Sequence, residues 1–130
     1  MINITVRSKK NFKLDKKQYY PQIAPATPVG LNDVAAQIEK QSTVSLSDIK
    51  GVLDALQEVV LEAVADGYSV RLGDLGSFRP TLRAVKSREK LEDVTASDIA
   101  AVRVRFTPSA ALTRRLLPSN LQLSLKRPNA

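Results

Sequence analysis

The sequence predicts an α+β protein, because its hydrophobic pattern changes period along the chain. Apolar residues recur at helical spacing between Leu31 and Val64, and they alternate with polar residues between Tyr68 and Phe106. The length of 130 residues fits a single core, and the 43% apolar and 25% charged residues are close to average globular usage. These observations together predict one folded domain rather than a disordered or collagen-like chain.

The N-terminal element is predicted to be one strand, since apolar and polar residues alternate from Ile2 to Arg7. The basic segment SKKNFKLDKKQYY follows it. Three prolines, Pro21, Pro25 and Pro28, then exclude a regular helix or a central strand. We therefore expect a connector before the first helix.

Two helices are predicted next. The first is LNDVAAQIEKQ, from Leu31, and the second opens where Ser45 and Asp48 resemble a capping box. Gly67 is expected to end the second helix. Its apolar stripe is too wide to be covered from one side, which indicates a dimer as well as a core. Three of its residues are assigned to that core or dimer contact: Leu53, Leu56 and Val60.

Three strands with period-two alternation are predicted after Gly67, the first two joined as a hairpin. Phe78 and Phe106 are expected to face the core and the dimer contact. Because side chains alternate along a strand, the arginines of all three strands should gather on the sheet surface opposite the helices. These arginines are Arg71, Arg79, Arg83, Arg103 and Arg105.

The C-terminal part is predicted to hold a short helix and a last strand. Thr107 is a plausible N-cap with Pro108 at the first helical position, and the helix should end by Pro118. Leucines then alternate with polar residues from Leu121 to Leu125. We expect this strand to pair with the N-terminal strand or to dock on a sheet edge.

The charge is segregated along the chain. The net charge is +7, with six bases and one acid in residues 1–20, two bases and seven acids in residues 21–68, and twelve bases and five acids in residues 69–130. Basic ends of this kind favour a polyanionic partner, because lysine and arginine neutralise phosphates and release counterions. Arginines on a sheet face can also enter a minor groove.

Most catalytic chemistry is excluded by composition. Cysteine and histidine are absent, which removes disulfides, thiolate or imidazole metal ligands and triads with a histidine base. No glycine-rich phosphate loop occurs. The chain is therefore predicted to be no enzyme and to use no metal and no cofactor. Without an apolar run of about 18 residues or a secretion signal, we expect a cytoplasmic protein with no membrane partner.

Two segments, GYSVRLGDLGSFRPTL and VRVRFTPSAALTRRL, resemble the HU and integration host factor family of bacterial nucleoid proteins. The resemblance covers about 91 residues, from Thr27 to Leu117, and Gly76 and Phe78 carry it best. Both terminal extensions are similar to a divergent, extended HU-like branch of that family. The resemblance implies an HU/IHF-like fold with two N-terminal helices, a three-stranded antiparallel sheet with an arm, a short C-terminal helix and extra terminal strands.

The resemblance also implies an intertwined homodimer whose sheets form a saddle on DNA, extended by two β-arms. By position it assigns DNA contact to the sheet arginines and to three cations of the arm. The complete set is Arg71, Arg79, Arg83, Lys86, Arg88, Lys90, Arg103 and Arg105.

The arm departs from the family pattern. Typical members carry an Arg-Asn-Pro tip whose proline wedges between base pairs, whereas the segment from Arg83 to Val102 contains no proline and no glycine. Its bases are followed by acids at Glu89, Glu92 and Asp93. We expect a shortened, mixed-charge loop, which folds against the body or orders on DNA and binds the backbone without the wedge.

The sequence thus predicts a histone-like, sequence-independent double-stranded DNA-binding protein of the bacterial nucleoid. Residues 27–118 are the predicted DNA-binding domain, residues 1–26 an N-terminal strand with a basic, proline-rich extension, and residues 119–130 a C-terminal strand or tail. The alternative is an HU-like scaffold that has lost DNA binding and contacts protein partners through its terminal strands. The sequence is also compatible with RNA as the partner.

Overall fold

The computed structural model describes residues 1–127 and contains two compact units. One unit combines Met1–Pro28 with Thr113–Ala130, and the other is Val29–Leu112. The last three residues of the predicted C-terminal tail, 128–130, lie outside the described residues. None of the helices in the described part of the chain is long and apolar enough to cross a membrane.

The first unit is built on a three-stranded sheet of order β2-β1-β6. Strand β1 (Ile2–Asn11) pairs in antiparallel fashion with β2 (Lys16–Ile23) and in parallel with β6 (Leu123–Lys126). The two ends of the chain therefore pair with each other, which confirms the expectation for the last strand. This strand begins two residues later than the alternation of leucines suggested.

Strand β2 corrects the start of the connector that was predicted at Pro21, because β2 continues through Pro21 to Ile23. Pro21 lies inside β2, opposite Val6, and β2 is an edge of the sheet. An edge strand can leave one side without ladder hydrogen bonds, so a proline is tolerated there. The turn before β2 is a local one, because the Asn11 side chain accepts a hydrogen bond from the Lys13 amide at 3.0 Å.

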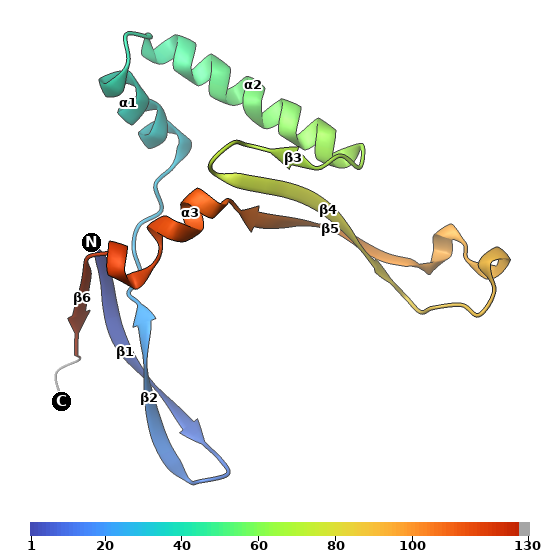
Figure 1. Cartoon of the computed structure of the whole chain (residues 1–130), viewed down its shortest axis with the longest axis horizontal. Helices are drawn as coiled ribbons and strands as arrows, with labels where there is room; N and C mark the ends of the chain where they lie inside the picture. The colour runs from blue at the N-terminus through green and yellow to red at the C-terminus, as the bar shows by residue number, and fades with distance from the viewer. Residues whose placement is uncertain (128–130) are drawn as a thin grey trace. The chain divides into compact units, whose positions relative to one another are not determined.

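In the second unit two helices pack against each other, and the second of them also lies against a sheet (Figure 1). Helix α1 (Leu31–Gln41) and helix α2 (Leu46–Ala65) match the predicted helices. Ser45 caps α2 by accepting from the Asp48 amide at 3.3 Å. At the other end Gly67 has φ +90°, and the amides of Gly67 and Tyr68 reach Val64 and Ala63 oxygens in a Schellman-type ending.

The sheet of the second unit has the antiparallel order β3-β4-β5. Strand β3 is only Val70–Arg71, whereas β4 (Gly76–Ala84) and β5 (Ile99–Pro108) pair along almost their whole length. These two strands continue past the helices as a two-stranded ribbon (Figure 1). The predicted arm, from Arg83 to Val102, is the outer end of this ribbon together with the loop that closes it, and that loop contains the short 3₁₀ turns η1 (Leu91–Asp93) and η2 (Ala96–Asp98).

Gly76 starts β4 at a position where no other residue fits. Its φ is +150°, and a β-carbon there would meet the Thr107 carbonyl oxygen and lie 2.8 Å from the Phe106 ring. The backbone of β4 can approach β5 this closely only because glycine has no side chain. The glycine that supported the family resemblance is therefore explained by packing.

The third helix begins later than predicted. Helix α3 is Ala110–Arg115, and Pro108 belongs to β5 instead of the first helical turn. Ser109 is the cap in place of Thr107, because its hydroxyl accepts from the Leu112 amide at 3.0 Å. A 3₁₀ turn, η3 (Pro118–Asn120), leads from the helix toward β6.

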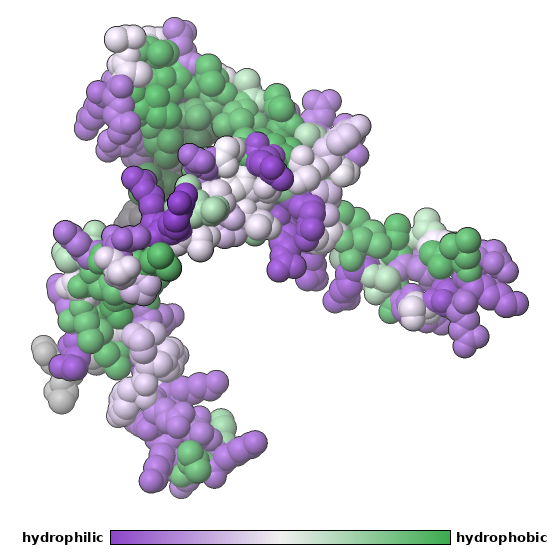
Figure 2. Space-filling view, viewed as in Figure 1, coloured by the Kyte–Doolittle hydropathy of each residue, from purple (hydrophilic) through white to green (hydrophobic). Residues whose placement is uncertain are grey.

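Little apolar surface is buried within one chain. Ala35 and Ile49 are the buried hydrophobic residues among those the structure describes. On α2, Val52 is 67% exposed and Val59 is 63% exposed. Figure 2 shows apolar side chains gathered over α1 and α2. A single chain therefore leaves a large part of its helical apolar surface in contact with water.

Candidate nucleic-acid interface

The strand register places all five predicted sheet arginines on one side of the β3-β4-β5 sheet. Arg79 lies directly opposite Arg105, and Arg103 lies opposite Thr81. Directly opposed residues share a face, and alternation brings Arg83 to the same face as Arg79. Arg71 lies opposite Ser77, and Ser77 is two residues before Arg79 on β4, so Arg71 is on the same face as well. We call this surface the arginine face: Arg71, Arg79, Arg83, Arg103 and Arg105.

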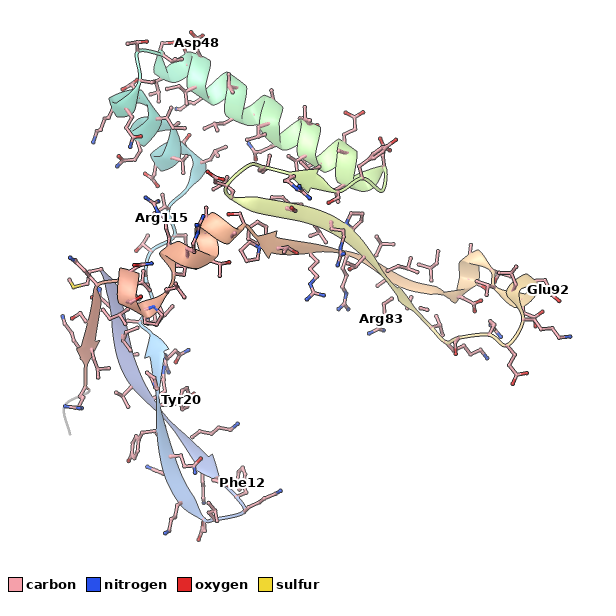
Figure 3. All side chains as sticks on the ribbon, viewed as in Figure 1. Phe12, Tyr20, Asp48, Arg83, Glu92 and Arg115 are labelled. Atoms are coloured by element: carbon pink, nitrogen blue, oxygen red, sulfur yellow. The ribbon has the colours of Figure 1, made fainter. Side chains whose placement is uncertain are left out.

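The arginine face is solvent-exposed, and no acid among the described residues pairs with it. All five arginines are exposed, and within residues 1–127 none of them forms an ion pair. Figure 3 shows Arg83 on the side of the ribbon that points away from α2. Like charges directly opposite each other across two strands, as at Arg79 and Arg105, are destabilising unless an anion compensates them. This surface therefore offers a binding place for a polyanion.

The opposite side of the same sheet is apolar. Phe78 lies opposite Phe106 with ring centroids 5.2 Å apart and planes tilted by 50°. Of the five residues predicted for the core or dimer contact, Leu53, Val60 and Phe78 are half-buried, whereas Leu56 and Phe106 are more than 40% exposed. A hollow of about 250 Å³ is lined by Leu56, Val60 and Phe78 together with Gln57, Leu61 and Leu72.

In the loop at the end of the ribbon, one cation is paired with an acid, unlike the arginines of the arginine face. Arg88 forms an ion pair with Asp98, with 2.7 Å between a guanidinium nitrogen and a carboxylate oxygen, and Nε also donates to that carboxylate at 3.2 Å. Asp98 is buried and additionally accepts from the Thr95 amide at 3.1 Å. The Val85 amide donates to the Asp98 carbonyl at 2.7 Å and closes the base of the loop. Arg88 thus holds the loop together.

This pair shifts both ionisation equilibria. The hydrogen bonds from Arg88, and then the one from the Thr95 amide, lower the pKa of the Asp98 carboxyl below its ordinary value of 3.8. The hydrogen bond to Asp98 raises the pKa of Arg88. Since the folded pKa of Asp98 is depressed, its contribution to stability is present above about pH 4 and is lost as the pH falls through the folded value.

The remaining loop cations, Lys86 and Lys90, are exposed and lie apart from the strand pairing that defines the arginine face. Their neighbours include Glu92, which Figure 3 shows on the loop. Sequence reasoning placed Arg88 with these cations as a DNA contact and missed that Asp98 engages it. The spacing of a base and an acid ten residues apart gives no signal of this contact, because it depends on how the loop closes.

The comparisons with known proteins agree with this geometry. The model of a family described as an HU domain fused to wHTH, Ig or glycine-rich motif matches residues 1–122. A candidate bacterial DNA-binding protein from Bacteroides vulgatus is similar in structure, with a TM-score of 0.68 and 15% identity. The match covers 98% of this chain and 49% of the other, so this chain spans about half the length of that protein.

Two HU structures are similar over a smaller part of the chain. A mutant of HU from Thermotoga maritima has a TM-score of 0.51 and 20% identity, and the match covers 68% of this chain and 99% of the other. HU from Anabaena, in a cocrystal with DNA, has a TM-score of 0.53 and 19% identity, over 67% and 96%. These likenesses show an HU-like fold. A search of curated protein sequences finds no match.

Proposed function

Because this chain belongs to the family of HU domains fused to wHTH, Ig or glycine-rich motifs, we propose that it binds double-stranded DNA as an architectural protein of the bacterial nucleoid. The DNA-binding domain is residues 27–118, between the N-terminal extension of residues 1–26 and the C-terminal residues 119–130. The observation that carries the proposal is the arginine face, where five exposed guanidinium groups share one sheet surface without an acidic partner in the described chain.

The binding is sequence-independent and acts through the DNA backbone and groove shape. Arginines neutralise phosphates and enter narrow minor grooves, neither of which requires a particular base. The ribbon loop carries three bases and four acids between Val85 and Asp98, and it contains no proline. Lys86 and Lys90 add phosphate contacts from the loop, beyond the arginine face, whereas Arg88 contributes mainly by holding the loop through Asp98.

The protein acts as a homodimer. Exposed apolar residues of α2, including Val52, Leu56 and Val59, need a cover that one chain does not supply. The hollow next to Leu56, Val60 and Phe78 gives a second copy a place to insert apolar side chains. Loss of apolar contact with water on association offsets the cost of bringing two chains together.

Titration of the full chain into a random-sequence DNA duplex at salt concentrations between about 50 and 200 mM tests the function. Binding that weakens steeply with salt, by a particle of twice the mass of one chain, supports the proposal. Absence of binding at the lowest salt would contradict it and favour the protein-interaction alternative. Tighter binding to an RNA duplex of the same length would assign the arginine face to RNA.

A further inference from the structure

The β2-β1-β6 sheet of the first unit also has two unlike faces. Opposed pairs on one face are Arg7 with Tyr20, Lys9 with Gln18, and Asn11 with Lys16. Lys126 of β6 lies opposite Thr5, which has the same parity. The other face begins with apolar residues, since Ile2 and Ile4 lie opposite Leu123 and Leu125. We call the first surface the second basic face and define it by Arg7, Lys9, Lys16, Gln18, Tyr20 and Lys126.

The second basic face has no acid of its own. Strands β1, β2 and β6 contain no aspartate and no glutamate. The nearby acid, Asp15, lies in the turn, and its carboxylate is 3.7 Å from the ammonium of Lys10, which belongs to the opposite face. Within the described part of the chain, the cations of the second basic face form no ion pair. Their positive charge is therefore available to a ligand.

The shape of this part of the sheet narrows the choice of ligand. Strand β6 pairs only with Ile2 to Thr5, so beyond that point β1 and β2 form a two-stranded ribbon that contains Arg7, Lys9 and Lys16. Near its turn is a hollow of about 400 Å³, lined by Lys9, Asn11, Phe12, Lys13 and Gln18. Ammonium and amide groups are hydrogen-bond donors for phosphate oxygens, and no carboxylate lines the hollow. Figure 3 shows Phe12 at the turn and Tyr20 on β2.

We propose that the second basic face binds the sugar-phosphate backbone of a DNA duplex, as a site separate from the arginine face. The inference rests on the proposed function, because it assigns the same kind of partner to a second surface. The major groove of a DNA duplex is wide enough to admit a two-stranded ribbon. Single-stranded DNA is a poorer fit, since its platforms stack successive bases on a row of aromatic side chains. Tyr20 is the one aromatic residue among the residues that define this face, and Phe12 lines the hollow at the turn.

The experiment compares two double variants of the full chain with equal loss of charge. Lys9→Gln/Lys16→Gln removes two cations from the second basic face, and Lys10→Gln/Lys17→Gln removes an opposed pair of cations from the other face of the same strands. Binding to a random-sequence duplex is measured against salt. The first variant should lower the salt slope by about 1.8, since each phosphate contact contributes about 0.9, and should weaken binding at least about tenfold at 0.1 M salt. The second should weaken it less than about threefold.

Five further results decide the proposal. Lys9→Arg/Lys16→Arg should bind like the unchanged chain, which separates loss of charge from loss of folding. Equal weakening by both double variants would overturn the assignment of binding to one face. Tighter binding of single-stranded DNA than of duplex, lost in Lys9→Gln/Lys16→Gln, would overturn the choice of duplex DNA as the ligand. If Arg103→Gln/Arg105→Gln weakens binding while Lys9→Gln/Lys16→Gln does not, the proposed function stands and the second site is wrong. If the unchanged chain does not bind DNA, both fail.

Discussion

The arginine face and the loop at the end of the same ribbon are both rich in cations, but they use them differently. On the strands, Arg79 and Arg105 lie opposite each other without an acid, whereas in the loop Arg88 is held by Asp98. Alternation along a strand forces like side chains onto one surface, and a loop lets a base and an acid meet. The count of charges in a segment therefore does not say which charges are available to a ligand.

The largest expected effect concerns the apolar side on which the arginine face is built. Phe106→Ala removes a ring that packs on Phe78 and should lower the free energy of unfolding by about 2 to 4 kcal/mol. This loss is smaller than for a fully buried ring, because Phe106 is partly exposed in a single chain. The loss is larger if a second copy covers the ring in a dimer. Thermal and urea unfolding measure this. Phe12→Ala, at a ring that is 88% exposed, is the control and should change stability by less than about 0.5 kcal/mol. Equal effects would show that Phe106 does not pack as described.

Removal of two arginines from the arginine face should reduce DNA binding next most strongly. Arg103→Gln/Arg105→Gln should lower the salt slope by about 1.8, equivalent to about 60-fold in affinity at 0.1 M salt relative to 1 M. Arg114→Gln/Arg115→Gln, which removes the same charge at the end of α3, is the matched control. An unchanged slope in the first variant, with the particle mass intact, would show that the arginine face is not the binding surface.

The loop should respond to loss of its internal partner. Asp98→Asn removes the anion that holds Arg88, so Arg88 becomes available to phosphate while the loop loses its closure. We expect faster proteolysis of the loop together with a gain in duplex affinity of about two- to eightfold, up to one added phosphate contact at 0.1 M salt. Glu92→Gln removes the same charge without breaking the pair and should leave proteolysis unchanged. Identical behaviour of the two variants would contradict the structural role of Asp98.

A smaller effect should appear in the absence of DNA. Since Arg79 and Arg105 oppose each other directly, Arg105→Gln should raise stability at low salt by about 0.2 to 1 kcal/mol, and high salt should remove the gain. Unfolding at two salt concentrations checks this. A loss of stability that does not depend on salt would mean that Arg105 contributes packing and that repulsion is not its main effect.

Local signals predicted most elements of the second unit. The spacing of apolar residues, with Ser45 and Gly67 at the ends of α2, is a short-range property that the sequence shows directly. The arginine face follows in the same way, because strand alternation does not depend on the rest of the fold. The predictions were wrong at two positions where the local sequence allows more than one structure. Pro21 argued against a strand, but an edge strand permits a proline. Thr107 was predicted to cap the third helix, but Ser109 caps it.

The sequence by itself determined the strand and helix periods, the segregation of charge and the side of each strand on which the arginines lie, because these depend on neighbours a few residues apart. Only the tertiary structure decided that β1 pairs with β6, that Gly76 lies against Phe106, and that Asp98 forms an ion pair with Arg88. Each of those contacts joins residues whose separation in the chain carries no periodic signal. Their formation depends on which strands become neighbours and how a loop closes, and local propensity does not determine either one.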